Sequence, residues 1–182
     1  SSGLPPPGQY CFNSYLGDIY LDNVDAVRFS VSGLCITVKA PTCTVMDISK
    51  NITVNMGTHN KTSFSGVGST TSEVPFTISL SNCQSVGSVF MQFNATVDTD
   101  YSGGDQIIHI DNSPNSATGV GIQILDSNNN PVTLNNPSQI WSGSKGSQTA
   151  YNFQYYARYF QTLSSVSAGE ANAVATYVLT YN

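Results

Sequence analysis

The feature that most constrains this chain is the alternation of apolar and polar residues over short runs. Phe76, Ile78 and Leu80 are separated by single polar residues, and Val120 and Ile122 show the same spacing. A two-residue period places apolar side chains on one face of a β-strand. Nowhere does an apolar period of 3.6 residues persist beyond two helical turns. Short strands separated by polar turns predict an all-β sandwich.

The same alternation predicts strands in several other regions. They are expected around residues 27–31 and 36–38, around 48–54, over 89–97, over 151–160 and over 171–181. A Gly-, Ser- and Thr-rich loop is expected over residues 58–72. The run from Asp126 to Pro131 predicts a strong turn because it is rich in Asn and ends in Pro.

The low charge of the chain excludes some classes of function. Charged residues make up 9% of it, against roughly 25% in ordinary soluble domains. The formal net charge is −5, and the six basic residues are scattered along the sequence. Nucleic-acid binding requires clustered Lys and Arg, so we expect no nucleic-acid partner. No apolar run approaches the ~18–20 residues that span a bilayer, and any signal peptide is expected to have been removed already.

The cysteines indicate an oxidising compartment. The chain contains Cys11, Cys35, Cys43 and Cys83, an even number that predicts two disulfides in a secreted protein. Three connectivities are compatible with the sequence. There is no C-x-x-C pair, and both histidines lie far from any cysteine in sequence. We therefore expect neither a metal site nor a cofactor.

Catalytic motifs are also lacking in the sequence. It contains no G-x-S-x-G, and its acidic residues fall mainly in turn-like stretches, whereas polysaccharide cleavage needs paired carboxylates. We expect that the protein is not an enzyme.

The C-terminal run alternates most regularly. It begins at Gly169 and ends at Asn182. A terminal strand with no following partner leaves one edge open, and an open apolar edge is an aggregation hazard unless it serves assembly. The residues that share one face of this run are Ala171, Ala173, Ala175, Tyr177, Leu179 and Tyr181.

These features resemble the pilins of bacterial chaperone–usher fimbriae. The resemblance covers about residues 34–182 and includes the penultimate Tyr181 and Gly169, fourteen positions from the end. It also includes the strand 119–125 and the aromatic segment 155–159. Residues 34–45 most resemble the opening of the pilin domain of a two-domain tip adhesin.

The resemblance implies a fold and a mode of assembly. The fold is an incomplete immunoglobulin-like β-sandwich that lacks its final strand and is completed by a donor strand. A periplasmic chaperone would fill the resulting groove first, an outer-membrane usher would receive the subunit, and a neighbouring subunit would then donate its strand. The implied function is a structural and assembly subunit of a fimbria, exported through the periplasm to the cell surface for adhesion.

The resemblance also implies site residues. It pairs Cys43 with Cys83, which leaves Cys11 to pair with Cys35. The residues expected to form the groove that binds the chaperone and the donor strand are Gly169, Ala171, Ala173, Ala175, Tyr177, Leu179, Tyr181 and Asn182.

The N-terminal region departs from a plain pilin, because more than forty residues precede Cys43. Val27, Phe29 and Val31 are a candidate donor strand. Alternatively, residues 1–33 are the tail of a receptor-binding domain, and 34–182 are the pilin domain of an adhesin. We favour the adhesin interpretation.

A different class of function stays open. The chain is alternatively a carbohydrate- or matrix-binding adhesin module in its own right, whose partner would be a host glycan or matrix protein. Tyr155, Tyr156 and Tyr159 offer rings for stacking on a sugar, although alternating aromatics more often fill a core and its rim. No feature of the sequence names the receptor or the source organism.

Overall fold

The computed structural model describes residues 6–21 and 24–182, with the side chains of residues 6–11 and 33–182. Its internal contacts divide the chain into two compact units, residues 1–41 and residues 42–182. Among the described residues, no helix is long and apolar enough to cross a membrane.

The first unit is a two-stranded antiparallel sheet. It consists of β1 (Gly8–Leu21) and β2 (Val24–Val38), and Cys11 lies opposite Cys35, to which a disulfide joins it. The strands expected at residues 27–31 and 36–38 both fall within β2. The expected boundary between residues 33 and 34 also falls inside β2, and the roles assigned to the two regions stay predictions.

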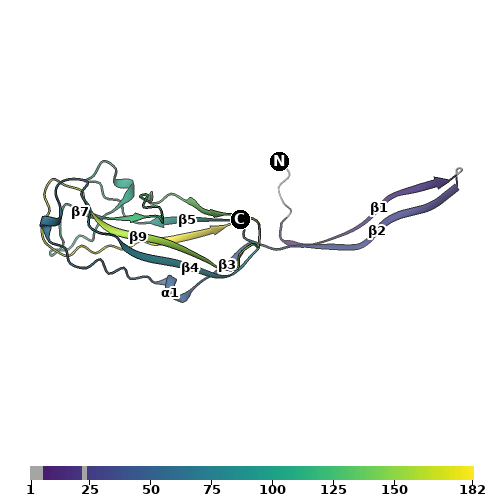
Figure 1. The fold of residues 1–182 in the computed structure, drawn as a ribbon, viewed down its shortest axis with the longest axis horizontal. Coiled ribbons are helices and arrows are strands. Elements are labelled where there is room, and N and C mark those ends of the chain that lie inside the picture. Colours follow the sequence, from purple (N-terminus) through teal and green to yellow (C-terminus); the bar gives the residue numbers. More distant parts are fainter. Residues whose placement is uncertain (1–5, 22–23) are drawn as a thin grey trace. The chain divides into compact units, whose positions relative to one another are not determined.

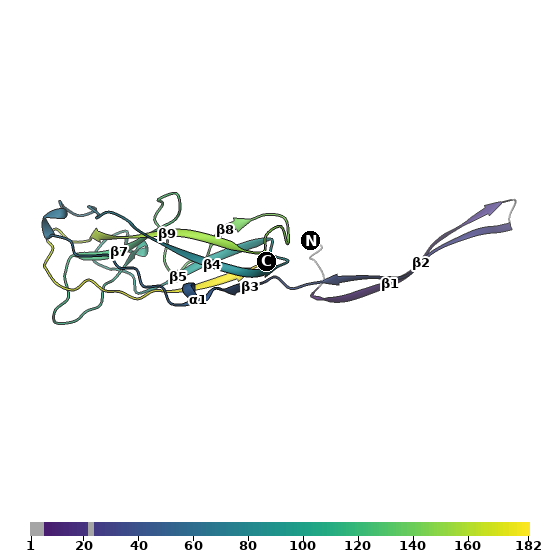
Figure 2. The ribbon, with the colours of Figure 1, turned by 60° about the horizontal axis from the view of Figure 1, so that its bottom comes forward.

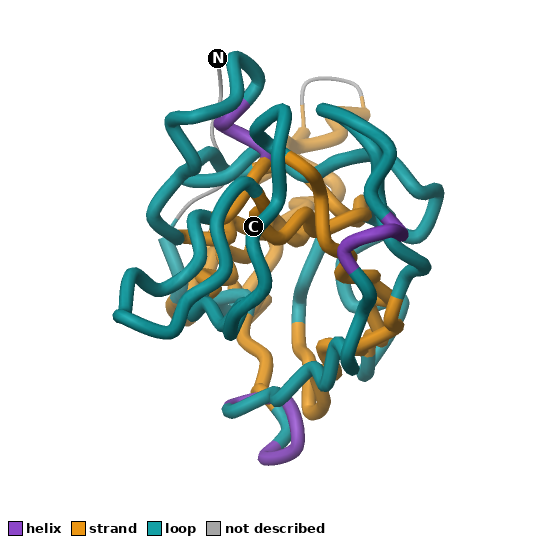
Figure 3. The backbone as a smooth tube through the Cα atoms, turned by 90° about the vertical axis from the view of Figure 1, so that its left-hand side faces the viewer, coloured by secondary structure: helices purple, strands orange, loops and turns teal. Residues whose placement is uncertain are grey.

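The second unit contains two antiparallel sheets (Figures 1 and 2). The larger has the order β3 (Thr42–Val45), β4 (Val74–Gln84), β9 (Tyr151–Gln161), β7 (Val120–Leu125) and β6 (Ile107–Ile108). The smaller has the order β10 (Thr176–Tyr181), β5 (Ser88–Asn94) and β8 (Ser138–Ser142). Helical segments are confined to the short turns α1 (Asp47–Lys50), η1 (Lys61–Ser63) and η2 (Gly104–Gln106), purple in Figure 3. The all-β prediction is confirmed.

The core lies between the two sheets because their strands bury alternate side chains. Ile78 of β4 and Phe93 of β5 are almost completely buried and belong to the same cluster. Tyr155 of β9 packs edge-on against Phe93, with ring centroids 5.0 Å apart. The other buried members of this cluster are Met91, Ile108, Ile124 and Leu134.

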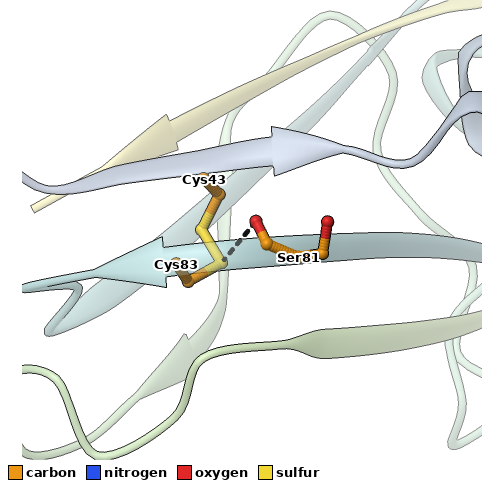
Figure 4. The surroundings of a disulfide bond; sticks show 3 residues. All are labelled: Cys43, Ser81 and Cys83. Carbon is orange, nitrogen blue, oxygen red and sulfur yellow. Dashed lines mark hydrogen bonds between the residues drawn. A yellow bond between two sulfur atoms is a disulfide. The ribbon is translucent and has the colours of Figure 1, made fainter.

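The second disulfide fastens β3 to β4. Cys43 and Cys83 are joined as the resemblance implied, and the Sγ atom of Cys83 lies 3.8 Å from the carbonyl oxygen of Ser81 (Figure 4). Cys83 is buried in a second apolar cluster with Leu80 and Val86. A short edge strand is thereby held to the sandwich covalently as well as by its hydrogen bonds.

Candidate functional site: an open groove beside β10

The strand β10 has a strand partner on one edge. It pairs with β5 in antiparallel register, with Tyr177 opposite Phe93 and Leu179 opposite Met91. It is the end strand of its sheet, and no described strand pairs with its other edge. Tyr177, Leu179 and Tyr181 are half-buried while the residues between them are exposed, which is the alternation that the sequence predicted.

The segment across from this free edge is extended but unpaired. Ile52, Val54 and Met56 are half-buried, and the residues between them are exposed. Within residues 52–59 the described chain forms no backbone-to-backbone hydrogen bond. The strand expected over residues 48–54 is therefore wrong as a paired element. Its first part forms α1, and the rest has the side-chain alternation of a strand but no neighbour to pair with.

An apolar cavity lies between this unpaired segment and the chain that leads into β10, which form its two walls. It has a volume of about 890 Å³, and residues 50–54 line one side while 173–177 line the other. Residues next in sequence, 57–61 and 166–172, line a further cavity of about 610 Å³. The floor of the first cavity includes Ile78, Phe93, Ile108, Ile122 and Ile124. We call the two cavities together the acceptor groove.

Tyr177 bridges the groove near one end. Its hydroxyl donates to the carbonyl oxygen of Ser49 over 2.5 Å, and the Ser49 hydroxyl in turn accepts from the backbone N–H of Ser79. Burial raises the pKa of Tyr177, which keeps the phenol protonated as a donor. Beyond this point Leu179 and Tyr181 pack against the second apolar cluster and do not line the cavity.

Comparison with known proteins identifies the family. The family model described as "Fimbrial protein" matches residues 32–182, which is more than half of the chain. The chain belongs to the fimbrial protein family. The S-fimbrial protein subunit SfaG of Escherichia coli is 36% identical over 84% of this chain and 83% of that protein. A type 1 fimbrial subunit of Salmonella typhimurium is 32% identical over 76% of this chain and 75% of its own length.

Two similarities involve adhesins about twice as long. A fimbria adhesin protein of Klebsiella pneumoniae is 26% identical over 86% of this chain and 50% of that protein. The CupB6 tip adhesin of Pseudomonas aeruginosa has a TM-score of 0.67 at 19% identity, over 87% of this chain and 47% of that structure. The same fold occurs in a type I fimbria protein of Burkholderia pseudomallei, with a TM-score of 0.57 at 26% identity over 96% of this chain.

The predicted family, its immunoglobulin-like pilin fold and its cell-surface location are thus confirmed. This fimbrial subunit is exported through the periplasm and becomes a structural part of a pilus, in contact with other pilus subunits. The relatives reported above are fimbrial proteins, and none is named as an enzyme.

The predicted groove residues of the pilin fall into three groups. Ala173, Ala175 and Tyr177 line the larger cavity, and Gly169 and Ala171 line the adjoining one. Leu179 and Tyr181 are half-buried against the second apolar cluster and line neither cavity. Asn182 belongs to the sheet, because its N–H donates to Ser88 and its carbonyl oxygen accepts from Gly87 and Ser88.

Gly169 is required by a close approach of two backbone segments. A Cβ atom at this position would lie 2.3 Å from the N atom of Ala117 and 2.4 Å from the carbonyl carbon of Ser116. The neighbouring Glu170 accepts a hydrogen bond from Ala117 and donates one to Asn115. The glycine therefore holds the rim of the groove against the loop that precedes β7.

The candidate donor residues Val27, Phe29 and Val31 lie in β2, and their side chains fall outside the described part of the chain. Their backbone pairs with β1, where Phe29 lies opposite Gly17. The wall formed by Ile52, Val54 and Met56 was missed as part of the site. The sequence did show the apolar alternation of these residues. Alternation indicates that one face of a segment is buried, but it does not show whether a neighbouring strand pairs with that segment.

No group of three or more potential metal ligands occurs among the described residues.

Proposed function

We propose that the acceptor groove takes up an extended donor strand from a neighbouring subunit, and that a periplasmic chaperone occupies it before delivery to an outer-membrane usher. The observation that carries this proposal is the unpaired backbone of residues 52–59, which lies across an apolar floor from residues 166–175 and the first residues of the free-edged strand β10. The unpaired backbone groups of this wall, together with the free edge of β10, match the hydrogen-bonding needs of one added strand.

The dimensions of the groove agree with such a strand. Its walls run from about residue 50 to 61 and from 166 to 177. A wall of about twelve residues, if fully extended, spans roughly 40 Å. About five side chains of the donor would face the floor, and burying each contributes roughly 1.5–3 kcal/mol, so that the total is on the order of 10 kcal/mol before ordering costs.

The proposal allows two roles for residues 1–33. In one, Val27, Phe29 and Val31 leave β1 and enter the groove of the next subunit. In the other, this region is the end of a receptor-binding domain, which the half-length alignment with two adhesins supports.

Thermal unfolding with peptides tests the groove. The disulfide-intact chain is melted alone, with peptides copying donor strands of candidate neighbours, with a peptide copying residues 24–33, and with a scrambled version. Filling the groove should raise the melting temperature by about 20 °C or more, because about 10 kcal/mol is added to a domain of this size.

A matched pair of variants locates the effect. Val54→Asp places a charge inside the groove and should abolish the rise. Asn55→Asp adds the same charge on the exposed side, where its oxygen still accepts from Gly57, and should keep the rise. An equal rise in both variants, or a cooperative high melt that no peptide changes, would show that the sandwich is already complete.

A further inference from the structure

Another cavity, apart from the two that form the acceptor groove, lies at the opposite edge of the smaller sheet. The order β10–β5–β8 places the acceptor groove at one end and β8 at the other. The cavity beside β8 has a volume of about 510 Å³, and residues of β8, of β9 and of the 126–136 loop line it. Cavities of roughly 300–1,000 Å³ are the size that holds small-molecule ligands.

The lining is polar and almost free of charge. Three side-chain amides line the cavity and form no hydrogen bond within the described chain. They belong to Asn136, Gln139 and Asn152. Asp126 is the charged residue among those that line the cavity. Its carboxylate already accepts from the backbone N–H groups of Asn128 and Asn130, and it therefore fixes the loop.

A tyrosine hydroxyl without a partner in the described chain belongs to the same cavity. Tyr155 is 4% exposed and lines it, and its ring is held by Phe76, stacked at 5.7 Å, and by Phe93. No hydrogen bond to the Tyr155 hydroxyl is present within the described chain. Burial, with a smaller contribution from the Asp126 charge, raises the pKa of Tyr155, so the group is a protonated donor at neutral pH. The Tyr155 hydroxyl itself is not among the fully buried side-chain atoms, so a ligand hydroxyl can reach it and replace water as its partner.

We infer that this cavity binds a neutral, hydroxyl-rich ligand the size of a mono- or disaccharide. Amides donate and accept toward sugar hydroxyls, and the Tyr155 hydroxyl supplies a further donor or acceptor at the floor. Phe153 and Ile140 give an apolar wall for the C–H face of a sugar ring. No Lys or Arg lines the cavity, which disfavours phosphorylated or acidic ligands. The site is separate from the acceptor groove and does not depend on donor-strand uptake.

Ligand-observed NMR on the whole 182-residue chain tests the inference. The probes are D-mannose, D-galactose, N-acetyl-D-glucosamine and lactose, titrated to millimolar concentrations, with glucose 6-phosphate as the charged comparison. Tyr155→Phe removes the hydroxyl and keeps the ring, and should weaken binding about three- to tenfold, as expected for one neutral hydrogen bond.

Two controls accompany this variant. Tyr156→Phe removes a hydroxyl from the next residue of β9, which does not line the cavity, and should leave binding unchanged. Val54→Asp, which disables the acceptor groove, should also leave it unchanged. Binding of none of the four neutral sugars, or binding that Tyr155→Phe leaves intact, overturns the inference without affecting the proposed groove.

Discussion

Gly169 shows how one residue supports the rim of the groove. Its missing side chain allows the backbone of residues 115–117 to approach within van der Waals distance. Gly169→Ala should lower the free energy of unfolding by about 1–3 kcal/mol, because the added methyl group meets backbone atoms that cannot move independently. Chemical denaturation measures the change. Ser164→Ala, an exposed position in the same connection, is the control and should change stability by less than about 0.5 kcal/mol.

Tyr177 makes one hydrogen bond whose removal is easily isolated. Tyr177→Phe keeps the ring that packs near Phe93 and deletes the donor to Ser49. The free chain should lose about 0.5–1.5 kcal/mol of stability. Comparison of urea midpoints at constant slope checks this, and a midpoint unchanged within error would mean that the Tyr177 bridge contributes nothing in solution.

At the scale of elements, the Cys43–Cys83 disulfide holds β3, the strand that precedes α1 and the groove wall of residues 52–59. The bonded residues are 40 apart in sequence, so its removal frees a long loop in the unfolded chain. The double variant Cys43→Ser/Cys83→Ser should lose about 4 kcal/mol by the chain-entropy relation. Cys11→Ser/Cys35→Ser removes the bond inside the other unit, and the melting of residues 42–182 should not respond to it.

Much of the element map was predictable from residues alone. Alternation located β4, β5, β7 and β9, and the C-terminal alternation located the free-edged β10. It failed over residues 48–54, because side-chain periodicity reports which face is buried, whereas a strand also needs a hydrogen-bonding neighbour. The cavity beside β8 was not predictable, since it depends on how a loop and two strands from different sheets meet. Tyr155 was noted as an aromatic, but its unpaired hydroxyl is visible only in three dimensions.

At the scale of the whole molecule, buried tyrosines make stability depend on alkaline pH. Burial raises the pKa of five phenols above the ordinary value near 10. In the folded state they retain protons that the unfolded chain releases, so stability is fully present below pH 10 and falls as pH rises from there toward the folded pKa values. The five residues are Tyr151, Tyr155, Tyr159, Tyr177 and Tyr181.

Unfolding free energies measured between pH 8 and 12, with phenolate absorbance recorded in parallel, check this dependence. The decline should be shallower in Tyr155→Phe, because one of the perturbed phenols is gone. A stability that stays constant through pH 11 would contradict it.

The aromatic side chains that lie between the acceptor groove and the cavity beside β8 have a consequence for the assembled fimbria. Phe76 and Phe93 line the acceptor groove, and the ring they hold, Tyr155, lines the cavity beside β8. These rings pack in one shared core, and the two cavities lie at opposite edges of the smaller sheet, so a donor strand and an occupant of the cavity beside β8 can be bound at the same time. A polymerised subunit would then keep the binding capacity of a free one, and a fimbria would carry one such cavity for every copy of this subunit.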